Sequence, residues 1–427
     1  MSLSHIEDEN KRRLIKSGAA FVRYGPLLFV SALVGNVGSF ALYFVGIRRL
    51  DIAAYGDLYA LITATALFSA VTASATVAIA KTCAELLGQD DAVRFAAFGK
   101  WLRNRAFLFA AIALVLACAV SAQAARYLHL IGPGEVVAWG FVTAASIVVP
   151  IYRGILQGAQ AFVSLAVSYI IEGALRAVLG IAAVVLGYGV AGALCGQGIA
   201  VLVCLWYVTA AVAPKLRASD GRAFRPDSRF FRSMYAAGGA VIAITVLASI
   251  DVLFAKHYLA PAQAGLYGIV ALVGRIIFFL AAFVPVIAIP RVASQAAQGK
   301  PSQHIILLSV GITAAIAATS LALIKLDPPL LVTVLAGGAY PDAATYVVRY
   351  GVAATFLALA NVTAGCQLAG HRFSFLAPLA AIVVLDALAL AHWHDSIGQL
   401  ITVTIAANAA AFLASCTGIW SKRQSAA

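Results

Sequence analysis

Charged residues are what this sequence most conspicuously lacks. Only 11% of its 427 residues are Asp, Glu, Lys or Arg, whereas 63% are hydrophobic. Soluble domains carry about a quarter charged residues, and a chain with so few cannot cover a globule of this size with polar surface. A soluble globular fold is therefore excluded, and lipid is the expected solvent for most of the chain.

Motifs for metal, disulfide or nucleotide chemistry are missing as well. The six cysteines are scattered, mostly within apolar runs, without C-x-x-C spacing, which is typical of small core residues. No Walker-type phosphate loop is present, so ATP-driven transport by this chain alone is not expected. No cofactor and no metal site is predicted. The net charge of +13 does not indicate nucleic-acid binding, because the basic residues lie between apolar runs rather than on one compact domain.

Long apolar runs are present instead along the whole chain. A membrane-spanning helix needs about 20 mostly apolar residues, and such runs predict an all-α integral membrane protein with about twelve transmembrane helices. The expected spans are 25–47, 55–80, 106–125, 135–156, 165–187, 190–212, 234–257, 265–290, 304–325, 343–365, 373–392 and 396–419.

Lys and Arg are distributed unequally between the two ends of these spans. With the N-terminus cytoplasmic, 22 of the 30 lie on the inner side, Arg153 among them, and five lie on the outer side. The remaining three, Arg176, Arg275 and Arg349, fall inside spans. The positive-inside rule therefore predicts that both termini are cytoplasmic.

The sequence contains an internal repeat. Residues 50–70, LDIAAYGDLYALITATALFSA, align with residues 259–279, LAPAQAGLYGIVALVGRIIFF, at an offset of 209 that places Gly56 on Gly265. Six spans plus six spans make a parallel repeat, in which two lobes enclose a central cavity. The expected organisation is a cytoplasmic lead-in at 1–24, an N-lobe at 25–213, a basic cytoplasmic linker at 214–232, a C-lobe at 233–420 and a cytoplasmic tail at 421–427.

Several segments resemble one transporter family. They are DVLFAKHYLAPAQAGLYGIVALVGRIIFFLAAFVPVIAIPRVAS at 251–294, YRGILQGAQ at 152–160, VLAGGAYPDAA at 334–344 and CQLAGHRF at 366–373. They are similar to segments of the polysaccharide-transporter flippases, within the multidrug/oligosaccharidyl-lipid/polysaccharide exporter superfamily. The resemblance implies a two-lobed flippase that carries undecaprenyl-linked oligosaccharide units for O-antigen, capsule or exopolysaccharide biosynthesis across the bacterial inner membrane.

The same resemblance implies partners and leaves two alternatives open. The implied partners are the lipid-linked oligosaccharide and membrane lipids, with a polysaccharide polymerase or glycosyltransferases as further candidates. One alternative is a cation-coupled small-molecule or multidrug exporter of the same superfamily. The other is a membrane scaffold of a polysaccharide-synthesis complex with no transport of its own. An enzyme is not expected, because the loops are too short to form a catalytic domain.

Arginines inside spans are the candidate substrate-binding residues, because charges in lipid are costly and face protein or a water-filled cavity. Arg275 and Arg176 are expected near the bilayer centre, and Arg349 in the outer half. Either they line the cavity and bind a pyrophosphate or acidic sugars, which suit a guanidinium, or they pair internally. Arg275 has no counterpart in the repeat, since Ala66 stands at its place in the first copy.

The acids inside spans are candidates for carrying a coupling proton or cation: Asp251, Glu172 and Asp386. Glu172 and Arg176 stand at i, i+4 and are expected to pair. Asp251 lies close enough to Lys256 and His257 for an outer-surface ion pair. Because three acids balance three arginines, the sequence does not predict a net cationic cavity.

Three prolines inside the expected spans are candidate hinges: Pro150, Pro285 and Pro378. They are expected to interrupt spans 4, 8 and 11, where neighbouring helices or cavity water satisfy the freed carbonyls. They act either as hinges for rocking of the lobes or as static kinks that shape the cavity.

Overall fold

All regular structure in the described part of the chain is helical. The computed structural model describes residues 3–217, 224, 228–298, 300–338, 340–417 and 419. The helices of the first half are α1 (Leu3–Arg49), α2 (Ile52–Gly88), α3 (Ala92–Ala119), α4 (Ser121–Tyr127), α5 (Pro133–Gly158), α6 (Phe162–Val185), α7 (Gly189–Val212) and the 3-10 helix η1 (Ala213–Leu216). Those of the second half are α8 (Ser228–Leu247), α9 (Ile250–Tyr258), α10 (Pro261–Ala281), α11 (Phe283–Ala297), α12 (Gln303–Leu326), α13 (Pro328–Ala336), η2 (Pro341–Ala343), α14 (Ala344–Ala369), α15 (Leu376–His392) and α16 (Ile397–Cys416).

The predicted all-α, multi-pass membrane architecture is confirmed. In the described residues, 11 helical segments are long and apolar enough to cross a membrane. The remaining expected span, 373–392, corresponds to α15, which is apolar but only 17 residues long. Large apolar side chains such as Val115, Leu116 and Leu323 are more than half exposed on the outside of the bundle, as a surface solvated by lipid requires.

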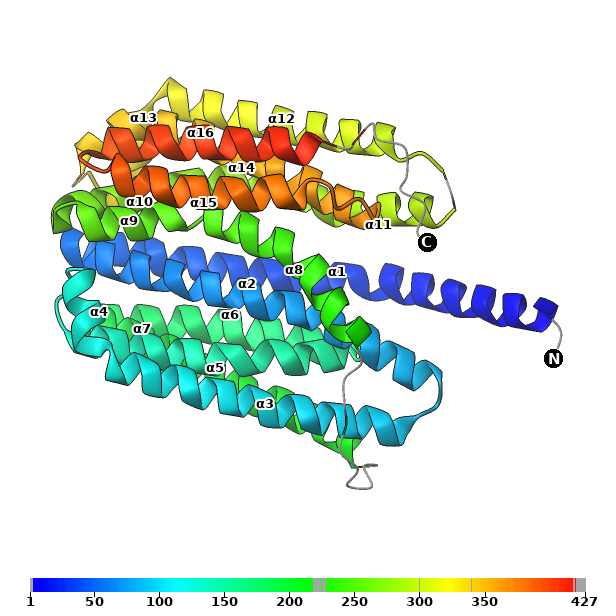
Figure 1. Cartoon of the computed structure of the whole chain (residues 1–427). Helices are drawn as coiled ribbons and strands as arrows, with labels where there is room; N and C mark the ends of the chain where they lie inside the picture. Colours follow the sequence, from blue (N-terminus) through cyan, green and yellow to red (C-terminus); the bar gives the residue numbers. More distant parts are fainter. Residues whose placement is uncertain are drawn as a thin grey trace.

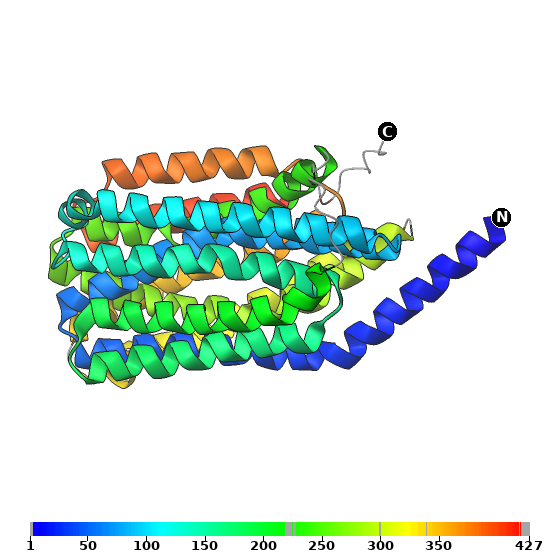
Figure 2. The same ribbon diagram turned by 90° about the horizontal axis from the view of Figure 1, so that it is seen from below.

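Helix boundaries differ from the expected spans at several places. The first span continues backwards into the expected lead-in, because α1 is helical from Leu3, and Figure 2 shows its first part extending away from the bundle. Span 7 is divided into α8 and α9 by a turn at residues 248–249, and span 8 into α10 and α11 at Ala282.

The three prolines do not all interrupt helices. Pro150 lies inside α5, which runs through it without a break, and its carbonyl accepts a hydrogen bond from the Thr76 hydroxyl at 3.0 Å. Pro285 is the third residue of α11, just after the break at Ala282. Pro378 is the third residue of α15, where a missing N–H costs no helical bond. The prediction that Pro150 and Pro378 interrupt their spans is therefore wrong, and the hinge roles of all three prolines stay predictions.

Local sequence signals explain where the helices start. The side chains of Asp51, Asp91 and Asp327 accept hydrogen bonds, each 2.9 Å long, from the third residue of α2, α3 and α13, respectively. A side-chain oxygen at this position satisfies one of the N–H groups that a helix leaves unpaired. The corresponding start in the second copy of the repeat, α10, has Pro261 as its first residue instead.

The helices form two groups that meet along α2. Figure 1 shows α2 to α7 on one side and α10 to α16 on the other, and we call α1 to α7 the N-lobe and α8 to α16 the C-lobe. The lobes meet mainly where α2 packs against α8 and α10. The start of α1 and the end of α16 point to the same end of the bundle (Figure 1). We call this the basic end and the opposite one, where α9 meets α10, the outer end, after the orientation predicted from the sequence.

The glycines that the repeat equates lie against each other in space. A Cβ on Gly56 would stand 3.0 Å from both the Cα and the backbone nitrogen of Gly265. A Cβ on Gly265 would overlap the carbonyl oxygen of Ile52. Only glycine at both positions allows α2 and α10 to cross this closely. The shared glycine pattern of the repeat is therefore explained by the contact between the lobes at the outer end.

Candidate functional site

A polar cavity lies mainly within the N-lobe. It has a volume of about 580 Å³ and is lined by residues of α1, α2, α5, α6 and α7, with Arg275 and Phe279 contributed by α10 of the C-lobe. Its charged lining residues are Arg153, Arg176, Arg275 and Glu172. The structure therefore brings together two of the three arginines predicted from the sequence and adds Arg153 to them.

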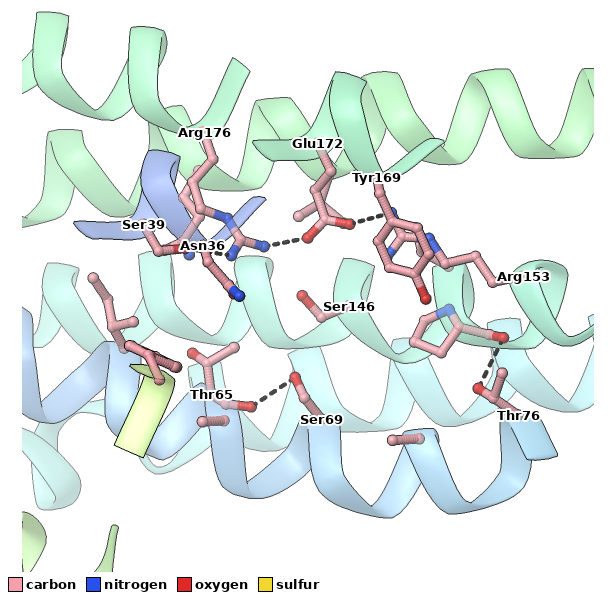
Figure 3. A pocket seen from close by; sticks show the side chains of 18 of the residues that line it. Asn36, Ser39, Thr65, Ser69, Thr76, Ser146, Arg153, Tyr169, Glu172 and Arg176 are labelled. Atoms are coloured by element: carbon pink, nitrogen blue, oxygen red, sulfur yellow. Dashed lines mark hydrogen bonds and ion pairs between the residues drawn. The ribbon is translucent and has the colours of Figure 1, made fainter. Parts of the chain in front are cut away.

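One wall of the cavity is a charged triad. The carboxylate of Glu172 bridges two guanidinium groups, that of Arg176 one helical turn away on α6 and that of Arg153 on α5, the latter at 2.8 Å (Figure 3). The predicted pair of Glu172 and Arg176 is thus confirmed. Arg153 is largely occupied by protein: it also donates to the Ser168 hydroxyl at 3.0 Å and stacks 3.9 Å from the ring centroid of Tyr169.

Arg176 retains donors that the protein does not use. Its Nη1 donates to the Ser39 hydroxyl at 3.3 Å and its Nη2 to Glu172. Its Nε is buried and has no hydrogen-bond partner among the described residues. A buried donor without a partner is costly, and an anionic oxygen in the cavity would satisfy it.

Arg275 reaches from the C-lobe into the cavity of the N-lobe. Its guanidinium donates to the Thr63 hydroxyl at 2.8 Å and to the Tyr43 hydroxyl at 3.4 Å, and lies 4.8 Å from the ring centroid of Tyr59. None of the ion pairs in the described part of the chain includes Arg275. Its direct partners are hydroxyl and aromatic groups, and the Asp251 carboxyl acts on it electrostatically without forming an ion pair, so Arg275 can bind an anion without first breaking one. Ala66, its counterpart in the repeat, lines the same cavity.

The balance of charge in the cavity could not be predicted from the sequence. Three guanidinium groups and one carboxylate line it, a net charge of +2. The two other candidate acids, Asp251 and Asp386, do not line the cavity. Three acids and three arginines balance along the sequence but are separated in space, and the cavity of the described structure is cationic.

Uncharged polar groups form part of the remaining wall, beside apolar residues such as Ile62, Val149 and Val201. Figure 3 shows Thr65, Ser69 and Thr76 of α2 facing Glu172 and Arg176 of α6 across the cavity. The polar uncharged lining comprises Asn36, Ser39, Thr65, Ser69, Thr76, Ser146, Gln157 and Gln197. The threonine and serine hydroxyls of α2 donate to backbone carbonyls of their own helix, which leaves their oxygens free to accept. The wall can therefore exchange hydrogen bonds with a ligand rich in hydroxyl groups.

The other candidate residues lie elsewhere. Arg349 is exposed on α14 and donates to the Thr402 hydroxyl of α16 at 2.9 Å. Asp386 is buried on α15 at 4% exposure. Asp251 is 1% exposed and accepts hydrogen bonds from Tyr267 and Tyr350, each at 2.7 Å. Their roles in binding or coupling stay predictions.

The expected surface ion pair of Asp251 with Lys256 and His257 is wrong. Lys256 instead points into the N-lobe, where its ammonium lies 2.5 Å from Asp57 of α2 and donates to the His129 carbonyl at 3.2 Å. Both charged side chains are only 1% exposed. Glu135, also buried, adds a second carboxyl beside Asp57. We call Asp57 and Lys256 the outer latch, because they join the two lobes at the outer end.

The interior positions of Arg153 and Asp57 could have been predicted from the sequence, but the contact between Asp57 and Lys256 could not. Arg153 lies inside the expected span 135–156 and was nevertheless counted with the inner end, although a position within a span points to the protein interior. Asp57 lies inside the expected span 55–80 as well, one residue after the repeat glycine Gly56. No sequence signal pairs it with Lys256, because that contact depends on how the lobes are docked.

Comparison with known proteins gives a result for the fold only. No protein-family model matches the sequence, and no curated protein matches it. Among solved structures, an inward-facing multidrug resistance MATE family transporter of the MOP superfamily has a TM-score of 0.72 at 12% identity, over 91% of this chain and 93% of that one. The lipid II flippase MurJ, in an inward closed conformation, has a TM-score of 0.71 at 9% identity, over 92% and 86%.

A third similar structure is a MOP superfamily transporter from Pyrococcus furiosus, described as having a binding pocket of reverse polarity that suggests a different function. It has a TM-score of 0.59 at 15% identity, over 94% of this chain and 95% of that one. At these identities the likeness concerns the fold. The chain therefore has the fold of MOP superfamily transporters, and its substrate must be argued from its own cavity.

Proposed function

We propose that this protein is a membrane flippase of the MOP type whose cargo is an anionic, lipid-linked oligosaccharide. The observation that carries the proposal is the cavity charge of +2 beside a wall of hydroxyl and amide groups. Guanidinium groups bind phosphate oxygens through paired N–H donors and stay charged at any physiological pH. A pyrophosphate-linked glycan combines the anion that the arginines bind with the hydroxyl groups that the opposite wall accommodates.

The proposal assigns different roles to the three arginines. Arg275 and the unpaired Nε of Arg176 bind the anion, because they hold donors that no described carboxylate occupies. Arg153 positions Glu172, and Glu172 in turn orients Arg176. Since Arg275 belongs to the C-lobe and the rest to the N-lobe, a bound anion would contact both lobes. When the lobes rock against each other, binding of the anion is then coupled to the opening of the cavity toward the other side of the membrane.

A cation-coupled multidrug exporter of the same superfamily is the second candidate. It is favoured by the likeness of the fold to a multidrug resistance transporter. A cavity that accepts free organic cations needs an excess of carboxylates, whereas this one has an excess of guanidinium groups. The charge of the cavity therefore supports the anionic cargo. Localisation in a bacterial inner membrane, and use in surface polysaccharide biosynthesis, belong to the same proposal.

Reconstitution in vesicles tests the function. The full chain is incorporated with a fluorescent undecaprenyl-pyrophosphate oligosaccharide, and the labelled lipid that becomes accessible to a membrane-impermeant quencher is measured over time. We expect Arg275→Ala to slow translocation by about 10- to 100-fold, the loss of one or two charge-assisted hydrogen bonds. Arg275→Lys keeps the charge and should retain an intermediate rate.

Arg349→Ala is the matched control, because it removes the same charge from a residue outside the cavity and should leave the rate unchanged. Translocation of an organic cation instead of the labelled lipid would favour the exporter. A folded protein in vesicles that moves neither would favour the non-transporting scaffold. Either result would overturn the proposal.

A further inference from the structure

A second group of cationic side chains lies at the basic end of the N-lobe, outside the cargo cavity. Lys100 and Arg103 of α3 and Arg217 after η1 line a pocket of about 330 Å³. Tyr152 of α5 and Thr209 of α7 complete its polar lining. Its volume is roughly ten times the 30 Å³ or so that a water molecule occupies in the liquid.

The charge of this pocket is not compensated by the protein. None of its lining residues is acidic, and none of the ion pairs in the described part of the chain includes Lys100, Arg103 or Arg217. Arg103 uses two donors, Nε and Nη2, on the amide oxygen of Asn104 at 3.2 Å. Because a guanidinium has five N–H donors, three remain for a ligand. Tyr152 is only 3% exposed and adds a fixed polar group at the base.

The walls of the pocket continue into apolar surface that faces away from the protein. Phe107 follows Arg103 by one helical turn on α3 and is 46% exposed. Trp206 precedes Thr209 by one turn on α7 and is 72% exposed. From Ala106 to the end of α3, and along all of α7, no residue is charged. The pocket thus lies where two apolar helical surfaces end, the level of lipid headgroups, at which tryptophan is enriched.

We propose that this pocket binds the phosphate of an anionic phospholipid, with the acyl chains along Phe107 and Trp206. Basic pockets between transmembrane helices bind anionic headgroups by this combination of charge and adjoining apolar surface. A soluble phosphate would use the charges but not the aromatic side chains. The site lies on a different face of α5 from the cargo cavity, because Tyr152 lines this pocket and the next residue, Arg153, about 100° further around the helix, lines the cavity.

Lipid binding by the purified full-length protein tests the proposal without any transport measurement. Delipidated protein is titrated with dioleoylphosphatidylglycerol, and bound lipid is counted by native mass spectrometry. Dioleoylphosphatidylcholine, which has the same chains, and inorganic phosphate are titrated in parallel. We expect one phosphatidylglycerol to bind in preference to phosphatidylcholine, and Arg103→Ala and Arg217→Ala each to weaken it by about tenfold.

Two further variants make the result specific. Arg105→Ala removes the same charge from the same helix two residues away, outside the pocket lining, and should bind as the unmodified protein does. Trp206→Ala should weaken phosphatidylglycerol but not inorganic phosphate. Arg217 is exposed in the turn after η1, so its replacement tests the site even if a change within α3 prevents folding.

Three outcomes would overturn the proposal. Equal losses for Arg105→Ala and Arg103→Ala would show a general effect of the basic surface. Unchanged binding in Arg217→Ala and Arg103→Ala would show that the pocket is not the site. Competition by inorganic phosphate at the same concentration as the lipid, unaffected by Trp206→Ala, would assign the pocket to a soluble anion.

Discussion

The outer latch is expected to decide which way the cavity faces. Lys256 of the C-lobe and Asp57 of the N-lobe lie 2.5 Å apart at 1% exposure each. Asp57 is further held by the Ile131 N–H at 3.2 Å, and Lys256 by the His129 carbonyl. Both partners of the lysine belong to the N-lobe, so separating α2 from α9 at the outer end must break both of its contacts, whereas the bond between Ile131 and Asp57 lies within the N-lobe.

The size of the effect follows from burial. Removing one partner of a buried ion pair costs about 3–5 kcal/mol, because the other charge is left buried without compensation. Opening of the outer end exposes both residues to water and removes that cost from the open state. Lys256→Met, which keeps the apolar stem, should therefore shift the equilibrium toward the outward-open state by on the order of 10² to 10³-fold.

Distance measurements between spin labels can detect the shift. Leu186 and Leu326 are 70% and 80% exposed at the outer end, one in each lobe. Each is replaced by a cysteine that carries a spin label, in a variant from which the six native cysteines have been removed. Pulsed electron resonance should give one short distance for the parent and a dominant longer one for Lys256→Met. The double variant Asp57→Asn, Lys256→Met should lie between these, because both charges of the pair are removed and Glu135 is the one neighbouring carboxyl that remains among the described residues.

Two results would refute this reasoning. An unchanged distance distribution in Lys256→Met would mean that the pair does not hold the lobes together. A double variant that is as open as the sum of the two single variants would mean that Asp57 and Lys256 act independently rather than as a pair.

The other predictions concern the cavity wall, the crossing of the lobes and the candidate outside the cavity. Glu172→Gln leaves two guanidinium groups without their shared carboxylate and should cost roughly 2–4 kcal/mol, at the lower part of the range for a broken buried pair because 15% of the side chain is exposed; an unchanged denaturation midpoint would contradict this. Gly265→Ala places a methyl group on the backbone of α2 and should destabilise by about 1–3 kcal/mol, whereas Gly311→Ala, with open space around it, should stabilise its helix by about 0.5–1 kcal/mol. Equal thermal midpoints for these two variants would disprove the close crossing. Arg349→Ala should leave anion affinity within about twofold in a titration, since its contact is a surface hydrogen bond, and a larger loss would place Arg349 in the binding site.

The architecture was predictable because it follows from properties that can be counted along the sequence. Apolar run length and charge density fixed the all-α membrane class, and the Gly56 and Gly265 alignment marked the two helices that cross between the lobes. The positions at which helices break were harder to predict from the sequence. The turn at Ala282 lies in uninterrupted apolar sequence, and the turn at residues 248–249 differs from its apolar surroundings only by Ser249 and the nearby Asp251, so hydropathy hardly changes where the backbone turns.

The site was predictable by residue type but not by grouping. An arginine within a span, Arg275, was identified from its cost in lipid and from its absence in the other repeat copy. The net charge of the cavity could not be predicted, because it depends on which acidic residues line the cavity. Glu172 lines it, whereas Asp251 lies elsewhere and is bound by Tyr267 and Tyr350. Counting charges along a sequence cannot separate groups that folding places in different lobes.

The central claim is that the cavity selects anions, and an equilibrium binding titration tests it most directly. Purified protein is titrated with undecaprenyl pyrophosphate, with the uncharged prenyl alcohol of the same length and with an organic cation. We expect the pyrophosphate to bind at least about tenfold more tightly than the alcohol, with most of this difference lost in Arg275→Ala and the cation bound most weakly. Tighter binding of the cation than of the pyrophosphate, or a preference for pyrophosphate that Arg275→Ala leaves intact, would contradict the account.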